Sequence, residues 1–291
     1  MKSSLKKASL SAGTRNALWG YGFIAIWLIG FFGFTLYPTV YSFIISLNDV
    51  RLTSNGMQFT WRGLYHYQYA LSVSGDFKMQ ISEGLTFIIC ATIVVVVFSL
   101  IIALLLNKKF PFRTFFRVVF FLPVVIMSGP VISKLLTGAT VDFSSHGELV
   151  YTFLNDLPSV LRSPTLFVLK NLVTILWFSG VQILMYLAGL QKISPDIYEA
   201  ASIDGAGSWE KFWKITLPHM KPMALINTVY TVVEISNYSE LGVNKLISNN
   251  MFNQTRIYSY SAAMSWLYFV IEAVLLILVF LVFKLFGRSD K

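Results

Sequence analysis

Six long apolar runs dominate this 291-residue chain. A helix that crosses a bilayer needs about 20 mostly apolar residues, and each run reaches that length. Charged residues make up only 13% of the chain, about half the share that is usual in soluble domains. We therefore expect an all-α integral membrane protein whose six transmembrane helices form one domain over residues 1–291. The expected spans are residues 19–46, 81–106, 115–136, 166–190, 218–237 and 264–286.

The positive charges set the expected orientation. The net charge of +9 arises from short basic clusters between the apolar runs, a pattern typical of membrane topology rather than of nucleic-acid binding. With a cytoplasmic N-terminus, 15 of the 23 Lys and Arg residues fall inside and six fall outside. Both termini are therefore expected in the cytoplasm, which agrees with six crossings.

The segment between the fourth and fifth spans is an unusually long internal loop. Ser194-Pro195-Asp196 has the pattern of a helix start, with a Ser cap, a Pro at the first position and an acid in the first turn. Gly205 and Gly207 are expected to end that helix, and Ser208 to cap a second one. We expect Pro218 to fix the start of the fifth transmembrane helix. A structured loop of this length indicates a docking function.

Motifs for covalent chemistry are missing from the sequence. It has no P-loop, no H-E-x-x-H, no G-x-S-x-G and only one cysteine, Cys90. His66, His146 and His219 lie in different loops, so they do not form a metal site. The sequence therefore predicts neither an enzyme, a metal site nor a cofactor in this chain.

The long loop carries the most specific pattern. Glu199-Ala200-Ala201, three residues, Gly205, nine residues and then Ile215-x-Leu217-Pro218 resembles the EAA loop of permease subunits in binding-protein-dependent ABC importers. All seven defining positions match. This resemblance implies that residues 191–218, the EAA loop, form a coupling helix against an ATPase subunit. The implied contact residues are Glu199, Ala200, Ala201, Asp204, Gly205, Ile215, Leu217 and Pro218.

The resemblance also implies the partners of the chain. They are a second, homologous permease that forms a heterodimer with it, two cytoplasmic ATPase subunits that bind ATP and Mg, and an extracellular solute-binding protein. The implied location is the bacterial plasma membrane, with several crossings. The implied mechanism is alternating access, in which ATP-driven motion of the ATPases switches the cavity between inward and outward states.

Other segments resemble the carbohydrate branch of the family. They include Gly63-Leu64-Tyr65-His66-Tyr67, where His66 stands at a position that is commonly Asn, and the extended loop motif Tyr198–Ala206. Two departures, at Gly84-Leu85-Thr86 and at Leu246–Asn250, weaken the transfer of a particular substrate. The resemblance implies import of a sugar or oligosaccharide, and the alternative is another solute such as a glycerol phosphodiester or a polyamine.

Polar residues inside the expected spans form the candidate translocation path. Such residues are costly in hydrocarbon and usually face a cavity or a partner. On the fifth span, Asn227, Thr231, Glu234 and Tyr238 share one helical face. The other candidates are Tyr230, Asn237, Gln182 and Glu272. Hydrogen bonding between helices is the alternative role for all eight.

Two other classes of function stay open. A membrane enzyme acting on lipid or glycan needs clustered acid, base, nucleophile or metal groups, which the sequence lacks. A permease-like scaffold or sensor that does not transport is the second alternative. Solute uptake depends on a transporter but not on such a scaffold.

Overall fold

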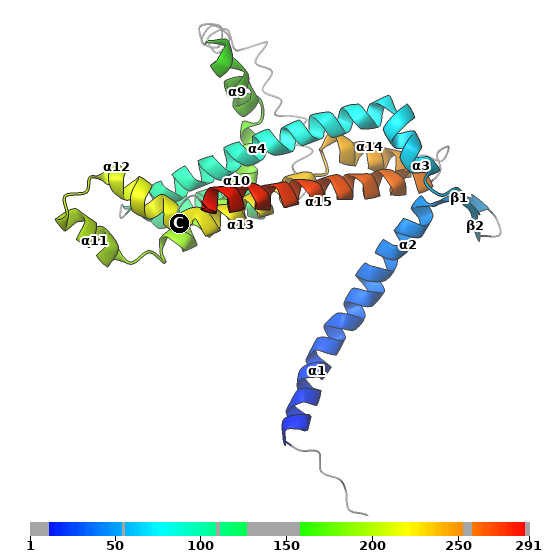
Figure 1. Ribbon diagram of the computed structural model, residues 1–291, viewed down its shortest axis with the longest axis horizontal. Coiled ribbons are helices and arrows are strands. Elements are labelled where there is room, and N and C mark those ends of the chain that lie inside the picture. Colours follow the sequence, from blue (N-terminus) through cyan, green and yellow to red (C-terminus); the bar gives the residue numbers. More distant parts are fainter. Residues whose placement is uncertain (1–11, 54–55, 109–110, 127–157, 253–257, 289–291) are drawn as a thin grey trace, which may run out of the picture. The chain divides into compact units, whose positions relative to one another are not determined.

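A computed structural model describes residues 12–53, 56–108, 111–126, 158–252 and 258–288 (Figure 1). The chain divides into two compact units. The first comprises Met1–Ser74 with Ile247–Leu267, and the second comprises Gly75–Leu246 with Tyr268–Lys291. Helices α14 (Gly242–Met251) and α15 (Tyr258–Arg288) contribute residues to both units.

The first unit begins with a continuous helix. α1 (Ala12–Gly30), the π-helical turn η1 (Phe31–Leu36) and α2 (Tyr37–Ser46) follow one another without a gap. The π turn stands directly before Tyr37-Pro38, and the N–H of Tyr37 bonds the carbonyl of Phe32, five residues back. A proline lacks an N–H and clashes with the carbonyl four residues before it, so a wider turn at this point keeps the helix continuous.

A β-hairpin follows this helix. β1 (Asn48–Thr53) and β2 (Gly56–Trp61) pair antiparallel, with Asn48 opposite Trp61 and Thr53 opposite Gly56. Gly56, the first residue of β2, has a φ of +109° that favours glycine. The expectation of an all-α chain is therefore wrong in this segment, although the chain is mainly helical. The short helix α3 (Tyr65–Gln68) and the π turn η2 (Tyr69–Val73) come next.

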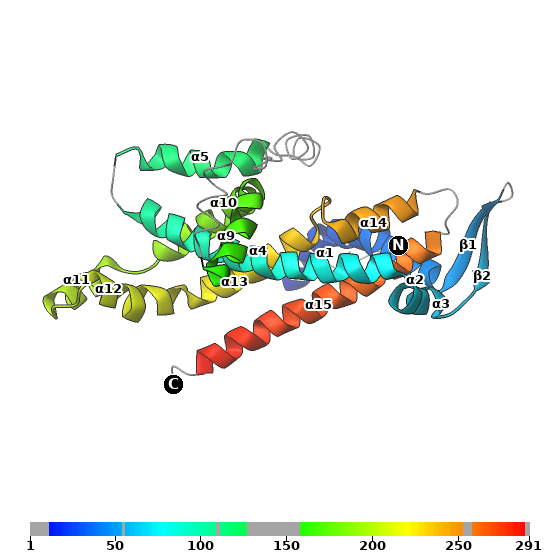
Figure 2. The ribbon, with the colours of Figure 1, turned by 90° about the horizontal axis from the view of Figure 1, so that it is seen from above.

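The second unit is a bundle of helices around α10. Its elements are α4 (Gly75–Asn107), α5 (Arg113–Ile126), α9 (Ser159–Lys170), α10 (Leu172–Leu190), α11 (Pro195–Ile203), α12 (Ser208–Lys211), the π turn η3 (Phe212–Thr216) and α13 (Leu217–Ser236), together with its parts of α14 and α15. α10 packs against α4, α5 and α13, and α13 also packs against α4 (Figure 2).

The core of this unit lies where α4, α10 and α13 meet. Its buried residues are Ala103, Leu106, Ile183, Tyr186, Leu187, Leu190, Ile193 and Met220. Gly189 allows α10 and α13 to approach closely, because a Cβ there would lie 2.7 Å from the Met223 Cγ.

Four helices in the described part of the chain are long and apolar enough to cross a membrane. They are Trp19–Ser46, Gly75–Asn107, Leu172–Leu190 and Tyr258–Leu285. α13 lies at the position of the fifth expected span, but its His, Lys, Asn and Glu residues make it more polar than these four. Only the first part of the expected 115–136 span, within α5, is described, and residues 127–136 lie outside the described residues.

The fourth span is shorter than the apolar run predicts. The run 166–190 is interrupted at Asn171, where α9 ends and α10 begins. The Asn171 side-chain amide donates to the Phe167 carbonyl at 2.8 Å. Asn side chains compete with the helical ladder in this way, and a hydropathy pattern does not register that competition.

α13 begins at Leu217, one residue before the expected start of the fifth span, and Pro218 lies in its first turn, but the helix also extends toward the loop. α12, η3 and α13 follow without a gap from Ser208 to Ser236, so the helix starts ten residues before Pro218. The π turn η3 stands directly before Leu217-Pro218, as η1 stands before Tyr37-Pro38. The same steric conflict is relieved in the same way at both prolines.

Candidate functional site

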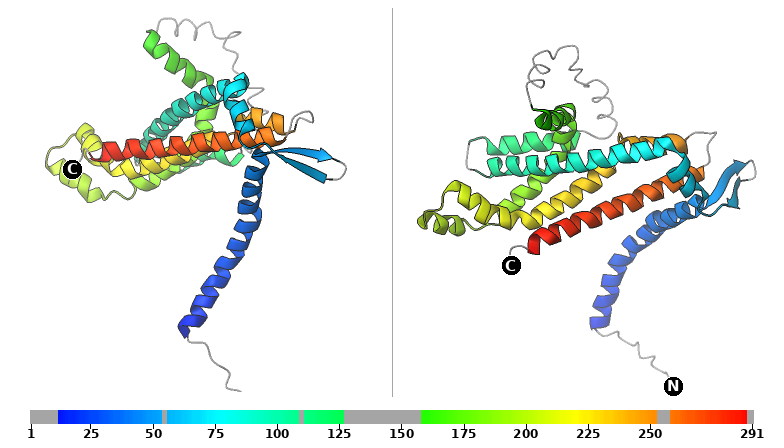
Figure 3. Two further views of the ribbon diagram at one scale, coloured as in Figure 1. Left: turned by 45° about the vertical axis from the view of Figure 1, so that its right-hand side comes forward. Right: turned by 45° about the horizontal axis from the view of Figure 1, so that its top comes forward.

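The EAA loop projects as a pair of short helices from the end of the second unit where α10 ends and α13 begins (Figure 3). The predicted start of its first helix is confirmed, since the Ser194 hydroxyl caps α11 and accepts from the Asp196 N–H. The predicted cap of the second helix is displaced by one residue. Gly207 is the cap, and its N–H donates to the Glu210 carboxylate at 3.2 Å. The Gly207 N–H and the nearby Lys214 hold the pKa of Glu210 below its usual value.

Internal hydrogen bonds fix the shape of the EAA loop. Gly205 has a φ of +79°, which confirms it as the turn between the two helices. The Ala206 N–H reaches back to the Ala201 carbonyl at 2.8 Å. The hydroxyls of Tyr198 and Thr216 lie 2.9 Å apart and join α11 to η3. The loop is therefore ordered by its own contacts.

The outer surface of the EAA loop is unusually apolar. The side chains of Ile203 and Trp209 are 88% and 72% exposed. Trp209, Phe212 and Trp213 form a cluster of edge-to-face and tilted rings. Glu199, Ala200, Asp204, Gly205 and Pro218 are exposed, whereas Ala201, Ile215 and Leu217 are half-buried. An ordered loop with large exposed apolar side chains is typical of a protein-docking site.

The eight candidate path residues differ in burial and position. Gln182, Asn227 and Thr231 are fully buried between α10 and α13. Glu234 is half-buried beside them, two residues before the end of α13. Tyr230 and Asn237 are exposed, and the Asn237 side chain bonds the carbonyl of Val233 in its own helix.

Gln182 is the centre of the buried group. Its side-chain nitrogen donates to the Thr231 hydroxyl at 3.0 Å and to the Glu234 carboxylate at 2.9 Å. The Thr231 hydroxyl donates to the Asn227 carbonyl at 2.7 Å. The Gln182 side-chain oxygen is buried and has no hydrogen-bond partner among the described residues. The polar residues of this α10–α13 polar interface therefore join the two helices, and one buried acceptor among them has no partner in the described part of the chain.

Tyr238 and Glu272 lie at the edge of this region. The Tyr238 ring contacts the rings of Trp177 and Phe178 with centroid distances of 5.4 and 5.5 Å. Glu272 is half-buried on α15, one turn beyond Tyr268, whose hydroxyl donates to the Ser236 carbonyl at 2.9 Å. Among the described residues, no group of three or more His, Cys, Asp or Glu side chains could hold a metal ion.

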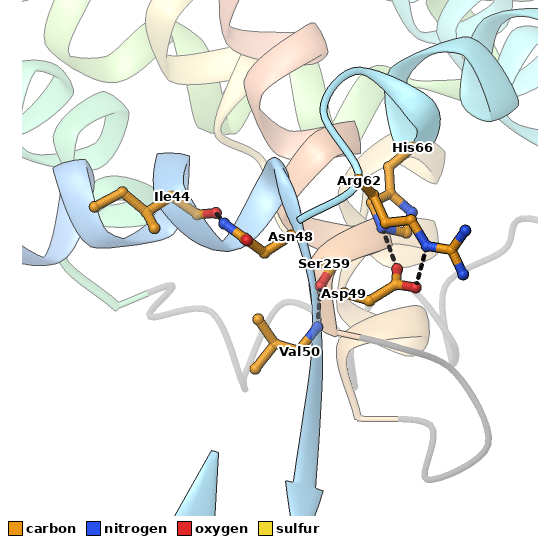
Figure 4. Close-up of polar contacts among 7 residues, drawn as sticks. All are labelled: Ile44, Asn48, Asp49, Val50, Arg62, His66 and Ser259. Atoms are coloured by element: carbon orange, nitrogen blue, oxygen red, sulfur yellow. Dashed lines mark hydrogen bonds and ion pairs between the residues drawn. The ribbon is translucent and has the colours of Figure 1, made fainter. Parts of the chain in front are cut away.

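The sequence did not reveal a polar cluster in the first unit. Asp49 on β1 lies 2.8 Å from the Arg62 Nε and 2.7 Å from the His66 Nε2 (Figure 4). Burial acts to raise the pKa of Asp49, but the contacts with Arg62 and His66 outweigh it and lower the pKa. The neighbouring Val50 N–H donates to the Ser259 hydroxyl at 2.9 Å, which ties the hairpin to α15. In the sequence, only the family-like segment Gly63–Tyr67, which contains His66, indicated that this region is of interest.

Comparison with known proteins places these features in context. The family described as "Binding-protein-dependent transport system inner membrane component" matches residues 108–289. The chain is 30% identical to the multiple sugar-binding transport system permease protein MsmF of Streptococcus mutans, over 90% of this chain and 94% of that protein. It is 28% identical to the lactose transport system permease protein LacF of Rhizobium radiobacter, over 85% and 88% of the two chains.

A solved structure shares the fold. A chain of a bacterial alginate ABC transporter, crystallised in complex with an alginate pentasaccharide-bound periplasmic protein, superposes with a TM-score of 0.70. The two chains are 20% identical, and the match covers 93% of this chain and 95% of the other.

Proposed function

Because this chain belongs to the family of inner membrane components of binding-protein-dependent transport systems, we propose that it is the permease subunit of an ABC importer for a sugar or oligosaccharide. The single observation that carries the choice of substrate class is the similarity, over most of the chain, to permeases named for multiple sugars and lactose. The α10–α13 polar interface supports it, since sugar hydroxyls need both donors and acceptors.

The topology of the proposed permease has six crossings and both termini in the cytoplasm. α5 with the residues that follow it, and α13, supply the two crossings beyond the four most apolar helices. In this orientation the EAA loop is cytoplasmic. Cysteines introduced at Ser208 and Ser54 in a Cys90→Ala background test it. An impermeant thiol reagent applied to intact cells should label position 54 and spare position 208, and the reverse pattern would invert the topology.

The EAA loop is the proposed contact with the ATPase. Its ordered backbone, the turn at Gly205 and the exposed Ile203 and Trp209 support this role. A second permease, two ATPase subunits that bind ATP and Mg, and an extracellular binding protein complete the proposed importer. The chain itself transports and breaks no covalent bond.

Solute uptake measured in the parent strain, in a deletion strain and in the deletion strain complemented with the gene tests the function. Radiolabelled lactose, maltotriose and arabinotriose represent uncharged sugars, and trigalacturonate represents acidic ones. Glycerophosphocholine and spermidine represent the alternative solutes. Loss of uptake of at least one saccharide on deletion, restored by the gene, supports the proposal. Loss confined to glycerophosphocholine or spermidine would replace the substrate class, and no loss of any solute would favour a scaffold.

A further inference from the structure

A cleft lined by both polar and apolar side chains opens on the second unit near the end of α13. It has a volume of about 460 Å³, which lies within the range of small-molecule sites. The walls are the first turns of α4, the junction between α9 and α10, and the segment that follows α13. The lining residues are Gln80, Glu83, Gly84, Phe87, Lys170, Asn171, Thr174, Tyr238, Glu240, Leu241 and Gly242.

The Tyr238 hydroxyl is the clearest sign that the cleft receives a ligand. Tyr238 is only 9% exposed, and its hydroxyl has no hydrogen-bond partner among the described residues. Trp177 and Phe178 hold its ring edge-to-face, so the position of the hydroxyl is fixed. A buried hydroxyl without a partner costs free energy, and a polar ligand that displaces the side chains covering it recovers that cost.

Two glycines let the two walls of the cleft lie close together. A Cβ at Gly242 would collide with the Gln80 side-chain oxygen, and a Cβ at Gly84 would lie 3.2 Å from the Val243 Cγ2. Glycine at both positions therefore allows α4 and the segment after α13 to meet.

The charges of the cleft favour an uncharged ligand. Glu83 and Glu240 line it together with Lys170, and Glu240 is neutralised by the Lys245 Nζ at 2.6 Å. No arginine is among the lining residues. Carboxylate recognition relies on an excess of Arg or Lys, whereas sugar hydroxyls need neutral donors and acceptors beside an aromatic face. Gln80, Asn171, Thr174 and Phe87 supply these.

We propose that this outer cleft is a binding site for an uncharged saccharide and that it discriminates against uronic acids. The inference rests on the proposed function, and in the proposed topology the cleft faces the extracellular side. The α13 residues of the α10–α13 polar interface end at Glu234, whereas the cleft is lined by residues from Tyr238 onward, nearer the extracellular side. A sugar released by the binding protein would therefore meet the cleft before it meets that interface.

A Tyr238→Phe variant tests the role of the hydroxyl. The change removes one hydrogen bond and keeps the ring packing, so the KM for uptake of the transported saccharide should rise about three- to tenfold with kcat little changed. Tyr258→Phe, at an exposed position on α15, is the matched control and should leave KM unchanged. An unchanged KM in Tyr238→Phe would overturn the role of this hydroxyl.

Thiol protection tests occupancy of the cleft directly. Glu83→Cys in a Cys90→Ala background is labelled with maleimide in the complete transporter, with binding protein and ATP, in proteoliposomes. Lactose, maltotriose or arabinotriose should slow labelling at least fivefold, and trigalacturonate should not. Ser82→Cys, exposed on α4 but not in the cleft, should be labelled equally with or without sugar.

The remaining outcomes separate the two proposals. Protection by trigalacturonate, absence of protection by any saccharide that is taken up, or failure of Glu83→Cys to react without sugar would each overturn the cleft proposal. In those cases saccharide uptake still stands. If deletion of the chain abolishes uptake of no saccharide at all, the proposed function fails first and the cleft proposal fails with it.

Discussion

The EAA loop and the α10–α13 polar interface both hold candidate functional residues, but they are built in different ways. In the loop, the contacts that set its shape join residues close in the chain, such as Gly205 to Ser202 and Ala206 to Ala201. At the interface, Gln182 bonds Thr231 and Glu234, which lie 49 and 52 positions away. The loop therefore keeps its shape while its surface stays exposed, whereas the interface depends on helix packing.

This difference predicts how each region responds to change. A substitution that distorts the loop should impair communication with a partner and leave the helix bundle folded. A substitution at the interface should affect both stability and transport. The predictions below run from the largest expected effect to the smallest.

Gly205→Val should have the largest effect. A β-branched residue at a φ of +79° is strained by about 1–3 kcal/mol, so the turn between α11 and α12 should distort. We expect saccharide uptake to fall at least tenfold while the subunit is still inserted and assembled. Gly207→Ala is the control, because Gly207 has a φ of −72° and open space around it. Normal uptake by Gly205→Val would remove the basis for a coupling role.

Gln182→Leu should weaken the interface. The change removes the donor to Thr231 and Glu234 and leaves buried polar groups without their partner, at a cost of about 1–3 kcal/mol. Thermal unfolding of the purified transporter should shift to lower temperature, and uptake should fall. Gln191→Leu, at an exposed position in the loop, should not change the unfolding temperature. Equal unfolding temperatures for the two variants would contradict the contrast between loop and interface.

The features that the sequence predicted correctly depend on local signals. Ser194-Pro195-Asp196 starts α11, and Gly205 adopts the positive φ that its place between two helices required. Two differences from expectation in the loop region also have local causes. Gly207 takes the cap one residue before Ser208, and a π turn lets the helix continue through Pro218.

Periodicity could predict only part of the interface. The spacing of Asn227, Thr231 and Glu234 correctly placed them on one face, and Gln182 was recognised as a candidate. Nothing local indicates that Gln182 bonds both Thr231 and Glu234, because pairing between helices depends on the packing of α10 on α13. For the same reason, the sequence could not show that Tyr230 and Asn237 are exposed.

Tyr198→Phe should have a smaller effect within the loop. It removes the hydrogen bond between the Tyr198 and Thr216 hydroxyls, worth about 0.5–1.5 kcal/mol, and retains the ring. Stimulation of ATP hydrolysis by sugar-loaded binding protein should fall about two- to fivefold. Ser208→Ala, at an exposed position in the same loop, is the control. A loss as large as that of Gly205→Val would show that the hydroxyl pair contributes as much as the turn.

Asp49→Asn should have the smallest effect. The Arg62 side chain is 53% exposed, so its pair with Asp49 contributes less than about 1 kcal/mol. Because the pKa of Asp49 is lowered in the folded state, its stabilising contribution is present above the ordinary value of 3.8 and is lost as the pH falls through the lower folded value. Unfolding measured against pH should therefore show a smaller loss of stability below about pH 4 in Asp49→Asn than in the wild type. If the two proteins lose stability equally below about pH 4, the contacts of Asp49 do not lower its pKa in the folded state.

The most direct test of the account measures saccharide import and ATP hydrolysis together, in proteoliposomes that contain the complete transporter and its binding protein. If the EAA loop couples ATP hydrolysis to transport and the α10–α13 polar interface contacts the sugar during transport, Glu234→Gln should lower import. It should retain ATP hydrolysis stimulated by sugar-loaded binding protein. Gly205→Val, in contrast, loses that stimulation and import together. If Glu234→Gln leaves import unchanged, or if Gly205→Val keeps full stimulation, the two regions do not have the separate roles proposed for them.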